Sequence, residues 1–225
     1  MLAVETLNLD RRLSADEVRR FRHLVRRRAG GEPISLIVGW TEFRGLRFAV
    51  ASGVFLPRQS SEFLVEQAVR RLRGRPEPIG VDLATGIGPI AIASAHAVRK
   101  ARVFGTDLSR PALRRARANA RALGLRNVSF HRGDLFGALP REVRGRVDVV
   151  TLHPPYVPRE EIGDLPLEVR GFEPEHTLTD YSPDGMGLVE RTAMGAWRWL
   201  RPGGWLLVEV SPDRTRYLKG VLRRA

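Results

Sequence analysis

The chain has 225 residues, of which 43% are hydrophobic and 28% are charged, as in an ordinary folded globular protein. It contains no cysteine, which excludes a disulfide scaffold, a thiol nucleophile and a thiolate metal site. No apolar run reaches the roughly 20 residues of a membrane helix, and the first residues lack the apolar core of a signal peptide. We therefore expect a cytoplasmic protein with no membrane partner.

The net charge is +13, which favours an acidic partner such as RNA or a ribosome. Of the 38 basic residues, however, only Lys100 and Lys219 are lysines. So strong a bias towards arginine is typical of a genome with biased base composition, and the charge permits proximity to RNA without requiring it. The five histidines are scattered in the sequence, so we expect no metal site.

Residues 1–75 are predicted to form an N-terminal unit of a helix, a β-hairpin and a linker helix. Ser14 and Glu17 have the spacing of a capping box, which indicates a helix over residues 14–29. Two apolar runs around Gly45, residues 34–40 and 46–50, favour a hairpin. A helix is expected from about residue 60 to 72, followed by a Gly- and Pro-rich boundary at 74–78.

Residues 76–225 show strands that alternate with helices. The predicted strands are residues 79–83, 102–106, 128–131, 147–152 and 205–210. The predicted helices are residues 89–98, 110–123, 185–200 and 213–224. This alternation predicts an α/β fold, a Rossmann-like parallel sheet with helices on both faces. In such sheets ligands bind at the carboxyl ends of the strands, where the winding reverses.

A glycine-containing loop follows the first strand of this sheet. Asp82 ends the strand, and Gly86-Ile87-Gly88 allows a tight turn in which a ligand can lie against bare backbone. Asp107 closes the next strand, where a carboxylate can accept hydrogen bonds from ribose hydroxyls. Asp134 follows the third strand and could meet an adenine amino group. A ligand with an amine, a ribose and an adenine is S-adenosylmethionine, whereas a nicotinamide dinucleotide explains Asp82 poorly.

The fourth strand runs into His153-Pro154-Pro155-Tyr156. Two consecutive prolines fix the backbone and leave carbonyl oxygens free to accept hydrogen bonds from N–H groups. Tyr156 offers a flat wall for a planar group. This loop resembles the [N/D]PPY motif of amino-group methyltransferases, with His153 at the asparagine position.

More of the chain resembles one family of these enzymes, the HemK/PrmC family, which methylates a glutamine side-chain amide in peptide-chain release factors. Residues 53–58 are similar to its GVLIPRPETE segment and residues 82–88 to its DLGTGSG loop. Residues 31–46, 157–174, 184–185 and 200–205 also match in the correct order. The resemblance implies a class I methyltransferase fold with S-adenosylmethionine as cofactor.

The resemblance also assigns roles to individual residues. It implies that the cofactor is bound by Ala84, Thr85, Gly86, Ile87, Gly88, Asp107, Leu135 and His153. Together with the acids at the strand ends, the predicted cofactor site also includes Asp82, Leu108 and Asp134. It implies that the substrate is bound by His153, Pro154, Pro155 and Tyr156, and we expect His153, Pro154 and Tyr156 to take part in catalysis. Phe55 and Arg58 are also predicted to bind the substrate.

Two departures from the family leave alternatives open. A neutral imidazole at His153 has one acceptor nitrogen, so His153 could accept an amide hydrogen bond, act as a base, or be purely structural. The chain also ends soon after the strand at 205–210, so the sheet is expected to lack its last antiparallel strand pair. The exposed edge at 205–210 would then need a homodimer contact or cover from the last helix.

The leading hypothesis is an S-adenosylmethionine-dependent N-methyltransferase of a protein glutamine amide. An alternative is methylation of a small metabolite or a modified peptide, since His153 loosens the link to release factors. A third interpretation is a non-catalytic paralogue that binds cofactor or RNA.

Overall fold

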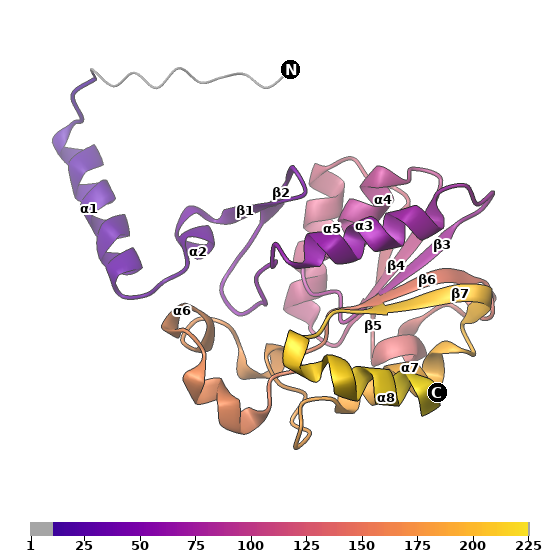
Figure 1. The fold of residues 1–225 in the computed structure, drawn as a ribbon. Coiled ribbons are helices and arrows are strands. Elements are labelled where there is room, and N and C mark those ends of the chain that lie inside the picture. Colours follow the sequence, from indigo (N-terminus) through magenta and orange to yellow (C-terminus); the bar gives the residue numbers. More distant parts are fainter. Residues whose placement is uncertain (1–10, 225) are drawn as a thin grey trace.

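A parallel sheet of five strands forms the centre of the computed structural model, which describes residues 11–224 (Figure 1). The strands are β3 (Ile79–Leu83), β4 (Arg102–Asp107), β5 (Val128–Arg132), β6 (Val147–Leu152) and β7 (Leu200–Val208). Their order in the sheet is β5-β4-β3-β6-β7, so the winding reverses between β3 and β6. The expected parallel α/β fold is therefore confirmed, and its switch point lies where β3 and β6 end.

Helices cover both faces of this sheet (Figure 1). One face carries α3 (Ser61–Leu72), α4 (Pro89–Ala97) and α5 (Arg110–Ala122), and the other carries α7 (Gly187–Ala196) and α8 (Thr215–Arg224). The core is split accordingly into two apolar clusters. Val103 and Val149 belong to the first cluster, whereas Val81, Phe104 and Val150 belong to the second. A strand that buries side chains on both faces needs an almost continuous apolar sequence, which is why these strands were recognisable.

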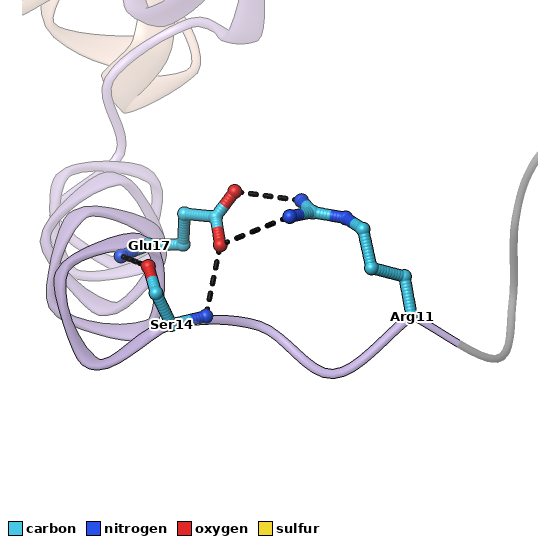
Figure 2. Close-up of polar contacts among 3 residues, drawn as sticks. All are labelled: Arg11, Ser14 and Glu17. Carbon is cyan, nitrogen blue, oxygen red and sulfur yellow. Dashed lines mark hydrogen bonds and ion pairs between the residues drawn. The ribbon is translucent and has the colours of Figure 1, made fainter.

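The N-terminal helix α1 (Ala15–Ala29) begins with the expected capping box (Figure 2). The backbone N–H of Glu17 donates to Ser14 Oγ at 3.3 Å, and the Ser14 N–H donates to Glu17 Oε2 at 2.8 Å. The Arg11 guanidinium holds the other Glu17 oxygen at 2.6 Å. None of the α1 side chains is buried by the described residues, and Figure 1 shows the helix set apart from the sheet.

The prediction of a strand at residues 34–40, as the first strand of the hairpin, is wrong. Residues 34–38 form a short helix, α2 (Ile34–Val38), and the hairpin consists of β1 (Trp40–Phe43) and β2 (Leu46–Ala49). Gly39 adopts φ +82°, and its N–H donates to the Ser35 carbonyl at 2.8 Å, which closes the helical turn. The β-branched run of α2 resembles a strand, but Phe43 and Phe48 are the residues that anchor the hairpin in the core.

Two further predicted boundaries are wrong. They are the end of the helix at 185–200 and the start of the strand at 205–210. The helix α7 ends at Ala196, and β7 spans Leu200–Val208. Val147 pairs with Leu200 whereas Val149 pairs with Trp205, so the Pro-Gly-Gly sequence lies in an irregularity within the strand. A bulge accommodates Pro and Gly residues that a regular strand ladder excludes. The Pro-Gly-Gly sequence, which predicted the end of a helix, therefore lies inside a strand.

The other predicted helices and strands agree with the structure to within two residues. Strand β7 lies at one edge of the sheet, and no antiparallel strand joins the sheet within the described range. Trp205 remains half exposed there, with the Arg71 guanidinium 4.1 Å from its ring centroid. Among the described residues, no helix is long and apolar enough to cross a membrane, and no group of acidic or histidine side chains could hold a metal.

Candidate functional site

Two loops that were predicted to act together lie side by side at the switch point of the sheet. Strands β3 and β6 are paired in register, with Leu83 opposite Leu152. The loop at residues 84–88 follows Leu83 and the loop at residues 153–156 follows Leu152. The sheet topology thus brings the glycine loop and the His-Pro-Pro-Tyr loop to one edge, where open α/β sheets bind ligands.

The glycine loop presents bare backbone to open space at Gly86, whereas Gly88 packs against Ile92 and Phe130. Ala84, Gly86 and Gly88 adopt φ values of +50°, +57° and +86°. A Cβ atom placed on Gly86 would meet no atom of the described residues within 4 Å, so the backbone there is open to a close ligand. Gly88 precedes α4, whose first residue, Pro89, lacks an N–H that would have no partner in the helix.

The buried side chain of Asp82 fixes the conformation of this loop through hydrogen bonds. Its carboxylate is buried and accepts hydrogen bonds from the hydroxyls of Thr85, at 2.5 Å, and Thr151, at 2.8 Å. Burial raises the pKa of Asp82 to about 6, although both hydroxyl bonds oppose that rise. Thr151 was not predicted as a site residue, because only the pairing of β3 with β6 places it against Asp82.

Asp107 connects the end of β4 with the glycine loop. Its Oδ2 accepts from the Gly86 N–H and its Oδ1 accepts from the Ser109 N–H, both at 2.8 Å. Burial raises the pKa of Asp107. Each carboxylate oxygen has two lone pairs, so the group retains the capacity to accept two further hydrogen bonds. That capacity fits a ribose with two hydroxyls, and Leu108 next to it is exposed.

Asp134 and Leu135 follow β5. Asp134 is exposed and forms an ion pair with Arg191 of α7. Leu135 is buried, with φ +45°, at the start of a short 3-10 helix over Leu135–Ala138. Both residues lie on the loop that follows Arg132, the last residue of β5, which pairs with Asp107 at the end of β4.

His153 is held on several sides. Its Nδ1 lies 3.0 Å from Ser61 Oγ of α3 and 3.7 Å from Glu209 Oε2. Its ring packs edge-on against Phe55 and is stacked with Tyr156, with centroids 5.4 Å and 5.9 Å away. Burial lowers the pKa of His153, Glu209 raises it and Arg58 lowers it further. The polar neighbours of His153 Nδ1, Ser61 and Glu209, therefore both come from outside its own loop, whereas Tyr156 of that loop contacts the ring by stacking.

A pocket of about 260 Å³ opens beside His153. Its lining residues come from three segments of the chain: Phe55, Arg58, Ser60, His153, Pro154, Pro155, Tyr156, Val157, Leu165, Val169, Thr177 and Leu178. The predicted substrate residues are thus brought together, including Phe55 and Arg58 from before α3. A wider surface hollow of about 510 Å³ lies near the start of α8 and contains none of the predicted site residues.

Glu173 fixes the segment that supplies Phe55 and Arg58. It is buried, accepts from Arg58 Nη2 at 2.7 Å and accepts from the Leu56 N–H at 3.3 Å. Burial raises the pKa of Glu173, and the Arg58 cation opposes this. The Arg58 guanidinium also lies 4.4 Å from the Phe55 ring centroid.

Sequence reasoning missed four polar residues of this region: Ser61, Thr151, Glu173 and Glu209. One signal was available for Glu209, which is a charged residue at the end of an otherwise apolar strand sequence. The contacts of the other three depend on elements that are distant in sequence, so no local pattern points to them.

The chain is similar to known methyltransferases in sequence and in fold. The model of a methyltransferase domain matches residues 81–170, and the model of the PrmC N-terminal domain matches residues 5–39. A release factor glutamine methyltransferase of Bordetella pertussis is 40% identical over 205 residues, which cover 91% of this chain and 74% of that protein.

Two further matches differ in kind. A 4-amino-L-phenylalanine/4-methylamino-L-phenylalanine methyltransferase of Streptomyces pristinaespiralis is 41% identical over 207 residues, covering 90% of this chain and 69% of that protein. The crystal structure of a methyltransferase from Pyrococcus furiosus superposes with a TM-score of 0.58 at 17% identity, covering 92% of this chain and 86% of that one. The last match shows the fold alone.

Proposed function

The chain belongs to the family of release factor glutamine methyltransferases, and we propose that it methylates the side-chain amide nitrogen of a glutamine in a peptide-chain release factor. One observation carries this proposal. The His-Pro-Pro-Tyr loop and the glycine loop lie at the same switch point, and a pocket of about 260 Å³ is lined by the former. This arrangement suits a planar acceptor held next to a nucleoside cofactor.

S-adenosylmethionine fits the residues at the end of β3, β4 and β5. When bound, this sulfonium compound supplies an electrophilic methyl group. Asp107 has two spare acceptor positions for ribose hydroxyls, and the open backbone at Gly86 allows close approach. In this proposal Leu108 and Leu135 pack against the two faces of the adenine ring, and Asp134 accepts a hydrogen bond from the adenine amino group. Asp82 acts by holding the loop that includes Ala84, Thr85 and Ile87.

The pocket residues orient the acceptor. An amide nitrogen is a poor nucleophile because its lone pair is delocalised, so the amide must be held with that lone pair towards the methyl group. In this proposal the Pro154 carbonyl accepts one amide hydrogen and His153 faces the other. Tyr156 and Phe55 provide flat walls, and Pro155 keeps the loop rigid. Orientation of this kind can lower a barrier by roughly 7–11 kcal/mol.

The proposed partner is a protein, and the proposed location is the cytoplasm, where release factors act. Proximity to a ribosome or RNA is part of the same proposal and draws support from the net charge of +13. A homodimer contact along the edge strand β7 remains a prediction, supported by the half-exposed Trp205 on that strand.

A second candidate substrate is an aromatic amine. The Streptomyces pristinaespiralis relative, named for an aminophenylalanine substrate, is as similar to this chain as the release factor enzymes are. The pocket has aromatic side chains at Phe55 and Tyr156, which suit an aromatic acceptor as well as an amide.

The test is transfer of a labelled methyl group from S-adenosylmethionine to purified acceptors. We expect label in a release factor and none in the same factor with its acceptor glutamine replaced by alanine. We expect Phe55→Ala to abolish most transfer, while Phe63→Ala, a matched change at an exposed phenylalanine of α3, leaves it intact. Label in 4-amino-L-phenylalanine alone would replace the first proposal by the second. Cofactor binding without transfer to either acceptor would support a non-catalytic paralogue.

A further inference from the structure

A buried carboxylate oxygen lies next to the histidine that replaces the family's asparagine. Oε2 of Glu209 is buried and has no hydrogen-bond partner among the described residues, and it lies 3.7 Å from His153 Nδ1. The backbone accounts for this position, because the Glu209 N–H donates to the Leu152 carbonyl at 2.9 Å. The strand ends of β6 and β7 thereby hold Glu209 and His153 side by side.

We propose that Glu209 and His153 form a carboxylate–imidazole base that accepts the proton released by the acceptor nitrogen during methylation. In this pair His153 is the catalytic residue, through Nε2, and Glu209 is the positioning residue. The inference rests on the proposed methyl transfer to nitrogen, and it assigns to this site a proton acceptor that the asparagine form of the motif lacks.

The surroundings of Nδ1 favour a proton on that atom. A lone pair on Nδ1 would face the Glu209 carboxylate and be repelled, whereas an N–H there is attracted to it. Ser61 Oγ, at 3.0 Å, can accept the hydrogen bond from this N–H. A neutral imidazole with its proton on Nδ1 has its lone pair on Nε2. Within residues 11–224, no hydrogen bond engages Nε2. His153 lines the pocket, and 11% of its side chain remains exposed.

The charges around His153 suit a base that starts neutral. Burial and the Arg58 cation lower its pKa, while Glu209 raises it. Tyr156, the other titratable neighbour, has a pKa that burial raises, so its hydroxyl stays neutral. Ser61 and Phe55 complete the surroundings and do not titrate. The imidazole is therefore neutral before the reaction, and Glu209 stabilises the imidazolium that forms in it.

Methylation of the acceptor nitrogen and the proton transfer together form two bonds and break two. The acceptor nitrogen forms a bond to the methyl carbon with its lone pair, and the carbon–sulfur bond breaks with its electron pair left on sulfur. The nitrogen then carries one proton in excess. Its N–H bond breaks with the pair left on nitrogen, and the proton goes to His153 Nε2. An asparagine oxygen can accept a hydrogen bond at that position, but it is too weak a base to take the proton.

The first test needs no acceptor and therefore stands even if the release factor proposal fails. We would record ring ¹⁵N and ¹H resonances of His153 in the full chain across a pH titration. We expect the Nδ1–H tautomer in the native protein. Glu209→Gln should lower the His153 pKa and shift the tautomer towards Nε2–H, whereas Glu66→Gln, the same change at an exposed site on α3, should alter neither. A native Nε2–H tautomer, or a tautomer unmoved by Glu209→Gln, would overturn the inference.

The second test separates action through His153 from a direct role of Glu209. In the native background, Glu209→Gln should reduce kcat by about 10²-fold, the lower end of the contribution of a general base, because His153 remains but loses the group that positions it. In a His153→Asn background the same change should cost little, because the base it positions is gone. Equal losses in both backgrounds would show that Glu209 does not act through His153. Thermal unfolding of each variant would exclude a loss caused by misfolding.

Discussion

The α-carbon of Gly185 lies against the main-chain carbonyl of Tyr156, so closely that a Cβ atom on Gly185 would be 2.3 Å from that oxygen. Gly185 also has φ +71°. The backbone of the segment before α7 thus packs directly against the backbone of the His-Pro-Pro-Tyr loop, with no side chain between them at Gly185. Any side chain at this position must displace the loop that shapes the substrate pocket.

We expect Gly185→Ala to impair both stability and methyl transfer. Gly203→Ala is the matched control, because Gly203 has nearly the same φ, +72°, but a Cβ atom there would meet nothing within 4 Å. Both changes carry the cost of a positive φ, about 1–2 kcal/mol. Only Gly185→Ala adds the clash, which should bring a further loss of about 1–3 kcal/mol. Urea unfolding measures the difference, and equal losses in the two variants would refute a supporting contact.

Asp107→Asn should weaken cofactor binding. The carboxylate accepts two backbone N–H groups, from Gly86 and Ser109, and an asparagine has only one oxygen for them. The asparagine NH2 group also cannot accept a ribose hydroxyl, and loss of one cofactor hydrogen bond to a charged group costs about 1.5–3 kcal/mol, which corresponds to a loss of affinity of about tenfold or more. Calorimetric titration with S-adenosylmethionine measures this. Asp16→Asn, at an exposed position on α1, should leave the affinity unchanged, and unchanged affinity in Asp107→Asn would remove Asp107 from the site.

Asp82 should make the stability of the protein depend on pH. Its pKa is raised by burial from 3.8 to about 6, so the folded chain binds the proton more tightly than the unfolded chain does. The stabilisation is therefore complete below pH 3.8 and is lost as the pH rises through about 6. The size of the loss is about 3 kcal/mol, because a tenfold change in proton affinity corresponds to about 1.4 kcal/mol.

The variant Asp82→Asn isolates this effect, because an amide does not ionise. Relative to the native protein, the variant should gain stability as the pH rises from about 4 to about 8. Denaturant unfolding of both proteins at several pH values gives the difference. A difference that stays constant with pH would mean that Asp82 has the same pKa in the folded and unfolded chains.

Ser14→Ala should loosen α1 without affecting the sheet. The capping box at Ser14 and Glu17 satisfies two N–H groups at the helix start, and its loss costs about 1 kcal/mol. Because no α1 side chain is buried by the described residues, the cost should stay within the helix. Hydrogen exchange should quicken at residues 15–29 while exchange in β3 and β6 is unchanged. Ser129→Ala, a serine change outside α1, should leave exchange in α1 as it is.

The sequence alone determined the features that depend on neighbours along the chain. The apolar runs of β3 and β6, the glycine turn at 84–88 and the rigid His-Pro-Pro-Tyr loop are all local patterns, and each lies where it was predicted. The alternation of strands and helices also placed Asp107 beside the glycine loop, since parallel strands end at the same edge of the sheet.

Tertiary structure decided what local patterns could not. The run at Ile34–Val38 has the composition of a strand, yet it turns as a helix because no strand within residues 11–224 pairs with it and Gly39 closes the turn. Likewise, the pairing of β7 with β6 turned a helix stop signal into a bulge. Most of all, Ser61, Glu173 and Glu209 contact the pocket residues His153 and Arg58 only because elements distant in sequence pack together. Folding brings such side chains together through burial and strand pairing, which no spacing along the chain records.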